Sequence, residues 1–161
     1  MGTERDPGRD AGGEPLARDI MTTPVVTISP DATVSELAAL FRERRVGGVP
    51  VVEDGRLVGI VTEGDLMALS ADVEMPHFFE LFDSVIYLGS MKKFRQQLRK
   101  AAAVTVRDLM TPAPLTVRPD DPARKAATLM ARHGFDRVPV EEDGRVVGII
   151  SRHDVLKLLD I

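Results

Sequence analysis

The sequence of 161 residues contains no cysteine and no tryptophan, and aromatic residues make up only 4% of it. Without cysteine the chain forms no disulfide and offers no thiolate for metal binding or nucleophilic catalysis. Because aromatic residues are scarce, the core must be built from Val, Leu, Ile, Ala and Met. Hydrophobic residues still amount to 43%, which is enough for a packed core. The lack of cysteine fits a reducing compartment, and we expect a cytoplasmic location.

A strong excess of one charge sign is also lacking, since 21 basic residues stand against 25 acidic ones. The net charge of −4 does not predict nucleic-acid binding. No apolar run approaches the roughly 20 residues of a membrane helix. Residues 1–15 have no apolar stretch of the kind found in signal peptides. We therefore expect a soluble protein without nucleic-acid or membrane partners.

An internal repeat is the strongest feature that is present. A shift of 89 residues aligns two segments without a gap. The matched strings are Asp19-Ile20-Met21-Thr22 with Asp108-Leu109-Met110-Thr111, Glu53-Asp54-Gly55-Arg56 with Glu142-Asp143-Gly144-Arg145, and Val58-Gly59-Ile60 with Val147-Gly148-Ile149. The repeat predicts four parts: a tail at 1–16, a first repeat at 17–67, an insert at 68–105 and a second repeat at 106–161.

Each repeat predicts the element order β-α-β-β-α. A short β-prone run ends near a proline, and an apolar stripe at helical spacing follows. Asp-Gly between two apolar runs then predicts a hairpin, and a final helix follows. The predicted elements are 25–28, 34–41, 49–52, 57–61 and 65–69 in the first copy, and 114–117, 123–130, 138–140, 146–150 and 154–159 in the second.

The hairpin runs are too apolar for a sheet that is wet on one face. A unit of about 50 residues cannot bury them alone. We therefore expect an α/β (α+β) fold in which the two repeats pack against each other with pseudo-two-fold symmetry.

These motifs resemble those of the cystathionine-β-synthase (CBS) domain. Each copy has Asp-hydrophobic-Met-Thr, then hydrophobic-Pro-Val before Asp-Gly, and then Val-Gly-Ile-hydrophobic-Thr/Ser-x-x-Asp. Two copies in tandem resemble a CBS pair, or Bateman module. The resemblance implies a regulatory module, not an enzyme, whose clefts between the repeats bind an adenosine-containing ligand such as AMP, ATP or S-adenosylmethionine. No cofactor is required. The alternative is a structural or interaction module with empty clefts, because some members of the family bind nothing.

The Ser/Thr-x-x-Asp strings, Thr62 to Asp65 and Ser151 to Asp154, begin the last helix of each repeat. A helix start offers N–H groups to phosphate, and the acid can accept hydrogen bonds from ribose hydroxyls. The same spacing is also a capping box, in which the hydroxyl caps the helix and the acid reaches back. Both roles can hold together.

The two copies differ just before the hydrophobic-Pro strand, where Arg137 replaces Gly48. Arg137 can bind phosphate, or it can be an ordinary surface residue that pairs with Asp136 or with an acid elsewhere. The predicted proline-containing edge and its neighbouring apolar side chains would hold adenine, unless those side chains are simply core. The predicted ligand residues are Val26, Gly48, Val49, Pro50, Thr62 and Asp65 in the first copy, and Leu115, Arg137, Val138, Pro139, Ser151 and Asp154 in the second.

Catalytic and metal sites are not predicted. Ser151, His153 and Asp154 are too close in sequence to align as a triad, and the first copy has Gly64 where His153 stands. His77 and His133 are isolated, and no ligand set for a metal is apparent.

Residues 75–88 of the insert hold four of the seven aromatic residues, and an apolar stripe with helical spacing follows at 91–102. Three interpretations stay open: packing on its own module or on a second chain, a docking surface for a protein partner, and a basic nucleic-acid or membrane helix. We expect a homodimer with the insert at or next to the interface, because its apolar side chains need cover. Regulation would act through an unidentified protein partner or through self-association.

Overall fold

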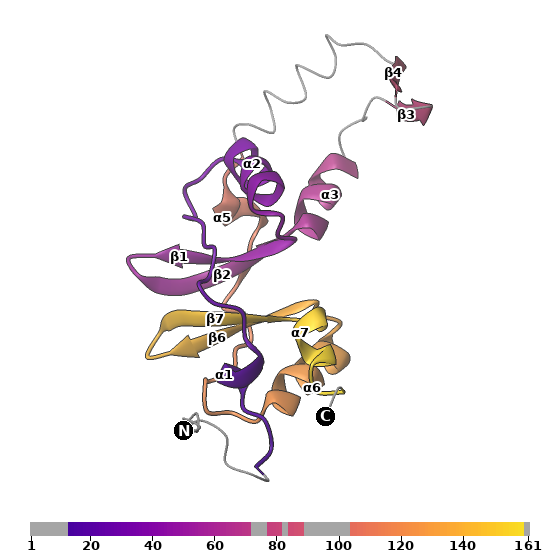
Figure 1. Cartoon of the computed structure of the whole chain (residues 1–161). Helices are drawn as coiled ribbons and strands as arrows, with labels where there is room; N and C mark the ends of the chain where they lie inside the picture. The colour runs from indigo at the N-terminus through magenta and orange to yellow at the C-terminus, as the bar shows by residue number, and fades with distance from the viewer. Residues whose placement is uncertain (1–12, 72–76, 82–83, 89–103, 160–161) are drawn as a thin grey trace, which may run out of the picture. The chain divides into compact units, whose positions relative to one another are not determined.

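The computed structural model describes residues 13–71, 77–81, 84–88 and 104–159 (Figure 1). The chain forms two compact units. Unit 1 contains the described residues of 1–25 and 115–161, and unit 2 contains those of 26–114. The units therefore differ from the sequence repeats, because the first segment of each repeat belongs to the unit formed mainly by the other repeat.

Unit 2 is built around one antiparallel hairpin. Helix α2 (Val34–Arg44) precedes β1 (Gly48–Glu53) and β2 (Arg56–Thr62), and α3 (Glu63–Ala71) follows. The short α5 (Val106–Leu109) leads to β5 (Thr111–Pro112), which adds to the far side of β2, so that the sheet order is β1-β2-β5. A separate two-stranded hairpin, β3 (His77–Leu81) and β4 (Ser84–Leu88), lies within the insert and was not expected from the sequence.

Unit 1 repeats this plan. Helix α1 (Ala17–Ile20) comes first in the chain, and α6 (Ala123–His133), β6 (Arg137–Glu142), β7 (Arg145–Ser151) and α7 (Arg152–Leu156) follow much later. The core of unit 1 joins Ala17 and Ile20 of α1 to Ala126 and Met130 of α6 and to strand residues such as Ile150. A separate cluster around Leu37, Phe41 and Val106 forms the core of unit 2. The mixed α/β class expected from the repeats is confirmed.

Local sequence explains where these elements start and stop. Thr33 and Glu36 form a capping box at α2, with the Thr33 N–H donating to Glu36 at 2.7 Å. Gly134 ends α6 in the left-handed conformation, with φ of 70°. Both hairpins turn on Asp-Gly with positive φ at each residue, as Asp54 and Gly55 show with 50° and 76°. This geometry matches the twist of the flanking strands. The two predicted hairpins are confirmed.

The first β-run of each repeat is not a strand, and prolines explain the difference. Residues 25–28 and 114–117 each make one parallel bridge, Ile28 with Val51 and Val117 with Val140. The Ile28 N–H donates to the Pro50 carbonyl, and the Val117 N–H donates to the Pro139 carbonyl, both at 3.1 Å. The next ladder bond would need an N–H from the proline itself, which has none. The parallel ladder therefore ends after one bridge.

Two motifs that recur in the sequence meet inside each unit. In unit 1, Met21 of the Asp-Ile-Met-Thr string covers Gly148 of the Val-Gly-Ile string, and a Cβ at Gly148 would overlap the Met21 side chain. In unit 2, Met110 covers Gly59 in the same way. The glycines are required by this close approach. Each methionine belongs to one repeat and its glycine to the other. We call residues 17–25 and 106–114 the exchanged segments, because each lies in the unit formed mainly by the other repeat. The methionine–glycine contacts hold these segments in place.

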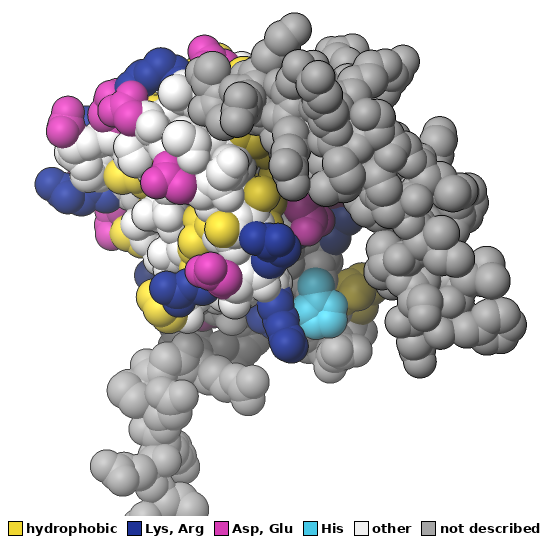
Figure 2. All heavy atoms as spheres, turned by 90° about the horizontal axis from the view of Figure 1, so that it is seen from above, with side chains coloured by type: hydrophobic (Ala, Val, Ile, Leu, Met, Phe, Trp, Pro, Cys, Tyr) yellow, Lys and Arg dark blue, Asp and Glu magenta, His cyan; other side chains and the backbone are white. Residues whose placement is uncertain are grey.

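The predicted helix at 91–102 lies outside the described residues, as do the insert side chains expected at a dimer interface. Among the described helices, none has the length and apolar character needed to cross a membrane. In the view of Figure 2, acidic and basic side chains are mixed over the described surface, and single hydrophobic side chains lie between them.

Candidate functional site

The Ser/Thr-x-x-Asp string of each repeat lies at the end of the hairpin, opposite the first residue of the partner strand. Thr62 pairs with Gly48 across β1 and β2. Ser151 pairs with Arg137 across β6 and β7. The hairpin register therefore brings together Gly48, Thr62 and Asp65 in unit 2, and Arg137, Ser151 and Asp154 in unit 1.

Both acids act as helix caps, as the structural interpretation predicted. The Thr62 N–H and hydroxyl donate to Oδ2 of Asp65 at 2.7 and 3.1 Å. The Ser151 N–H and hydroxyl donate to Oδ2 of Asp154, both at 2.9 Å. Capping uses the same carboxylate oxygen in the two units. The role of each acid in ligand binding then depends on its second oxygen, Oδ1.

The second oxygen is engaged in unit 1 and open in unit 2. Oδ1 of Asp154 accepts from the Lys157 ammonium at 2.7 Å and from the Thr22 hydroxyl at 3.4 Å. Oδ1 of Asp65 accepts no hydrogen bond from any described residue. The residues aligned with Lys157 and Thr22 are Ala68, which has no amine, and Thr111. Sequence analysis missed Lys157 and Thr22, although an acid and a lysine three residues apart on a helix are a recognisable pair.

The two acids also differ in how deeply they are buried. Asp154 is 4% exposed, whereas Asp65 is half-buried. Burial acts to raise the pKa of Asp154, but hydrogen bonds from Lys157 and Ser151 outweigh it and hold the pKa below the ordinary value of an aspartate. Asp154 is thus a fixed anion with its hydrogen-bond partners supplied by the chain.

Arg137 does not form the ion pair that was the alternative to phosphate binding. Asp136 pairs instead with Arg152, at 2.7 Å between Oδ1 and Nε. Arg137 makes no ion pair with any residue that the structure describes, and it is half-buried at the start of β6. Arg137 lies opposite Ser151 in the hairpin register, and its guanidinium has no acidic partner among the described residues.

The proposed adenine contacts divide into buried side chains and open backbone. Val49 and Val138 are fully buried and pack in the cores, together with Pro50 and Pro139. Val26 is half-buried, and Leu115 is 45% exposed. Because Pro50 and Pro139 end the parallel ladders, the carbonyls of Val26 and Leu115 accept no backbone hydrogen bond from the described residues. A base that binds beside Pro50 or Pro139 would therefore meet mainly backbone carbonyls and little side-chain surface.

The helix starts offer fewer free N–H groups than the sequence suggested. The Glu63 N–H donates to the Gly47 carbonyl at 3.0 Å, and the Arg152 N–H donates to the Asp136 carbonyl at 3.1 Å. The Asp154 N–H donates to the Ser151 hydroxyl at 3.3 Å. Phosphate binding at these positions would thus depend more on side chains such as Arg137 than on the helix ends.

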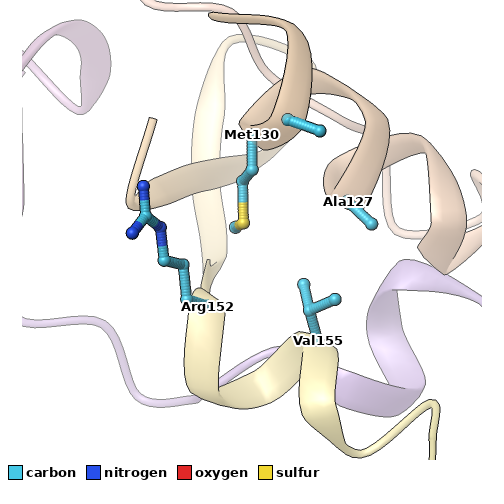
Figure 3. A pocket seen from close by; sticks show the side chains of 5 residues that line it. Ala127, Met130, Arg152 and Val155 are labelled. Carbon is cyan, nitrogen blue, oxygen red and sulfur yellow. The ribbon is translucent and has the colours of Figure 1, made fainter. Parts of the chain in front are cut away.

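A cavity of about 300 Å³ lies on the helical face of unit 1. Met130 of α6 and Val155 of α7 point toward each other across it, and Arg152 lies at its edge (Figure 3). Ala127 and Ala131 complete the lining, and no predicted ligand residue is among these five. Within the described ranges, no group of three or more His, Cys, Asp or Glu residues could hold a metal ion.

Comparison with known proteins identifies the repeats. The model of the CBS domain matches residues 17–72 and 106–161. An uncharacterised protein of Methanocaldococcus jannaschii is 31% identical over 153 residues, covering 89% of this chain and 90% of its own length. The chloroplastic CBS domain-containing protein CBSX2 of Arabidopsis thaliana is 36% identical over 137 residues, covering 81% of this chain and 56% of its own length.

Solved structures agree with the sequence matches. CBSX2 in complex with AMP has a TM-score of 0.67 and 30% identity, covering 89% of this chain and 95% of that one. The CBS domain pair of protein MJ0100, in complex with 5′-methylthioadenosine and S-adenosylmethionine, has a TM-score of 0.69 and 25% identity, covering 92% and 98%. The resemblance drawn from the motifs is confirmed, and the chain belongs to the CBS domain family as a tandem CBS pair.

Proposed function

We propose that this CBS pair is a non-catalytic regulatory module that binds an adenosine-containing ligand of the AMP, ATP or S-adenosylmethionine class. The observation that carries the proposal is a juxtaposition found in both units. A carboxylate that accepts from the backbone N–H and the hydroxyl of the Thr or Ser three residues before it lies at the same end of the hairpin as a proline that ends the parallel ladder. The carboxylate can accept from ribose hydroxyls, and the open carbonyl beside the proline can accept from the adenine amine.

The comparisons support the ligand class. CBSX2 was solved with AMP, and the MJ0100 pair was solved with 5′-methylthioadenosine and S-adenosylmethionine. All three molecules carry adenosine, so the shared chemistry is an adenine base and a ribose. We assign ribose binding to Asp65 and Asp154 with their hydroxyl partners Thr62 and Ser151. The base lies beside the backbone of Val26, Gly48, Val49 and Pro50 in unit 2, and of Leu115, Val138 and Pro139 in unit 1.

Thermal unfolding with each candidate ligand tests the proposal. AMP, ATP and S-adenosylmethionine are added separately, and a ligand present at about 100 times its Kd stabilises the folded chain by about 2.7 kcal/mol. We expect a rise in Tm with at least one of them, and none in the Asp65→Asn/Asp154→Asn double variant. Unchanged Tm with all three would favour the alternative, a structural or interaction module without a small ligand.

Phosphate binding is assigned to Arg137, whose guanidinium is unpaired among the described residues. Gly48 provides no such group in unit 2. AMP should therefore bind unit 1 more tightly than adenosine by about tenfold, the effect of one charge-assisted hydrogen bond. Arg137→Ala should remove the preference, while Arg152→Ala, which breaks the neighbouring ion pair, should keep it. Equal affinities for AMP and adenosine in Asp65→Asn, which leaves only the unit 1 site, would exclude Arg137 from the site.

We also propose that the chain is a cytoplasmic homodimer that regulates a protein partner. Met67 of α3 and Leu156 of α7 occupy equivalent positions in the repeats and are 70% and 53% exposed. Together with the cavity between Met130 and Val155, they give the helical faces apolar surface that a second copy can cover. Light scattering at micromolar concentration should give twice 17.6 kDa, and Met67→Glu with Leu156→Glu should give the monomer. A monomeric unchanged protein would contradict the dimer.

A further inference from the structure

The two acids of the Ser/Thr-x-x-Asp boxes differ in a way that bears on which unit takes a ligand. We infer that Lys157 is a specificity-determining residue that occupies Oδ1 of Asp154, so that an adenosine-type ligand binds first at Asp65. The inference rests on the proposed function, because it concerns the same two carboxylates. It adds an order of binding and names the residue that sets it.

Lys157 is placed to compete with ribose. Its ammonium lies 2.7 Å from Oδ1 of Asp154 and donates to the Ile20 carbonyl at 3.4 Å. A ribose hydroxyl that donates to Asp154 would compete with this ammonium, because Oδ1 also accepts from the Thr22 hydroxyl and Oδ2 already accepts two bonds from Ser151. Replacing a charged donor by a neutral hydroxyl exchanges a stronger hydrogen bond for a weaker one. Binding at Asp154 therefore carries a cost that is absent at Asp65.

The same contacts tie Asp154 to the exchanged segment. Thr22 donates to the carboxylate, and Lys157 holds the last carbonyl of α1 at Ile20. Asp154 and Lys157 thus fasten residues 20–22 onto unit 1. A ligand at Asp154 would remove this fastening as well as the ion pair.

Unit 2 fastens its exchanged segment without using its acid. Arg107 of α5 donates to Glu53 at 2.6 Å and to Asp31 at 3.3 Å. Residues Thr111 and Pro112 pair with β2 through the backbone. Position 68, aligned with Lys157, is an exposed alanine on α3. Oδ1 of Asp65 therefore remains open for a ligand.

The residue difference can be exchanged between the units, which gives the experiment. Ala68→Lys places an ammonium three residues after Asp65, as Lys157 stands after Asp154. Ala68→Met is the control of similar length without the charge. Lys157→Met removes the competing charge from unit 1 and keeps most of the side-chain length. Because position 68 is exposed, both substitutions there are compatible with folding.

Calorimetric titration of the full chain with AMP, ATP and S-adenosylmethionine measures the outcome. We expect one tight binding event, lost in Asp65→Asn and kept in Asp154→Asn. Ala68→Lys should weaken it about tenfold relative to Ala68→Met, and Lys157→Met should strengthen a second, weaker event about tenfold. A lysine that only stabilised the fold would not change the ratio of the affinities at Asp65 and Asp154 in this way.

Two results would overturn the inference while leaving the proposed function intact. One is a tight event that Asp154→Asn removes and Asp65→Asn preserves. The other is equal affinity in Ala68→Lys and Ala68→Met. Absence of binding for all three ligands, in both the unchanged chain and Lys157→Met, would instead overturn the proposed function. The inferred order of binding would then also be wrong, because it depends on that function.

Discussion

Units 1 and 2 hold the same kind of exchanged segment by different means. In unit 1, the buried Asp154 contacts Thr22, and Lys157 contacts Ile20. In unit 2, the exposed Arg107 bridges Asp31 and Glu53 at the outer surface. The aligned residues of unit 1, Arg18, Asp120 and Glu142, do not form that bridge. Unit 1 thus engages Oδ1 of its Ser/Thr-x-x-Asp acid with Lys157 and Thr22, whereas in unit 2 the equivalent oxygen of Asp65 accepts no hydrogen bond from the described residues.

The difference shows how two copies of one motif can diverge without a change of backbone. The hairpin registers, the hydrogen bonds from Thr62 and Ser151 to the acid three residues on, and the single parallel bridges are equivalent in the two units. What differs is a few side chains: Lys157 against Ala68, and Arg137 against Gly48. The chemistry that each unit presents at this position therefore differs through individual side chains on a shared scaffold.

The largest effect is expected at the contact between Gly148 and Met21. A Cβ at Gly148 would lie 2.8 Å from Cγ and 3.0 Å from Cβ of Met21, so more than the flexible end of the side chain must move. Gly148→Ala should lower the free energy of unfolding by about 1–3 kcal/mol, the usual cost of overpacking. Urea denaturation measures the change. Gly59→Ala, which meets Met110, should show the same effect in unit 2.

The repeat itself supplies the control for this prediction. In a double-mutant cycle, Gly148→Ala should couple to Met21→Ala by about 1 kcal/mol or more and should not couple to Met110→Ala. The second pairing is the one expected if each repeat packed only on itself. Coupling of Gly148 to Met110 would therefore contradict the exchanged connectivity.

The exchange was not visible in the sequence for a physical reason. Helices α1 and α5 have four residues each, too few to show an amphipathic period. The longer helix α2, with Leu37 and Phe41 on its buried face, and the two Asp-Gly hairpins were predicted because their patterns are local. The Asp-hydrophobic-Met-Thr and Val-Gly-Ile strings recur visibly in the sequence. The sequence does not show that the methionine of one repeat packs on the glycine of the other.

The candidate site was predicted in the same uneven way. Asp65 and Asp154 were identified from spacing, and their capping contacts follow from that spacing. Val49 and Val138 are buried in the cores. The sequence could not show this, because a short run in which every residue is apolar does not indicate which side chains face the core and which face a ligand. Thr22 contacts Asp154 across 132 residues of chain, a distance over which no local pattern gives information.

An intermediate effect is expected when the charge of Asp154 is removed. Asp154→Asn keeps an oxygen for the Ser151 N–H but loses the ion pair with Lys157, so the free energy of unfolding should fall by about 1–2 kcal/mol at neutral pH. Asp65→Asn should cost less, because Asp65 has no cationic partner among the described residues. Urea denaturation of the two variants compares the units directly. Equal losses would remove the distinction between them.

The pH dependence of the same variants sharpens the comparison. The pKa of Asp154 is lowered in the folded chain, so its contribution to stability is complete above the unfolded value of about 3.9 and is lost as pH falls through the folded value. The difference in stability between the unchanged chain and Asp154→Asn should therefore stay constant from neutral pH to about pH 4 and shrink as the pH falls further below about 3.9. A difference that also stays constant below about pH 3.9 would show that the carboxylate charge is not what stabilises unit 1.

The smallest effect is expected at the surface bridge of unit 2. Arg107 is 45% exposed and its partners Asp31 and Glu53 are 78% and 38% exposed, so solvent screens both pairs. Arg107→Ala should lower Tm by only about 1–3 °C at low salt, and by less at 1 M salt. Arg18→Ala, the aligned change in unit 1, is the matched control and should leave Tm unchanged.

The response of the Gly59–Met110 contact gives a sharper test of the same bridge. If Arg107 helps hold α5, Arg107→Ala should couple to Met110→Ala and not to Met21→Ala in a double-mutant cycle. A coupling of zero to both would show that the surface bridge does not help hold α5, and that the segment is held by the Met110–Gly59 contact and by backbone hydrogen bonds such as the pairing of Thr111 and Pro112 with β2.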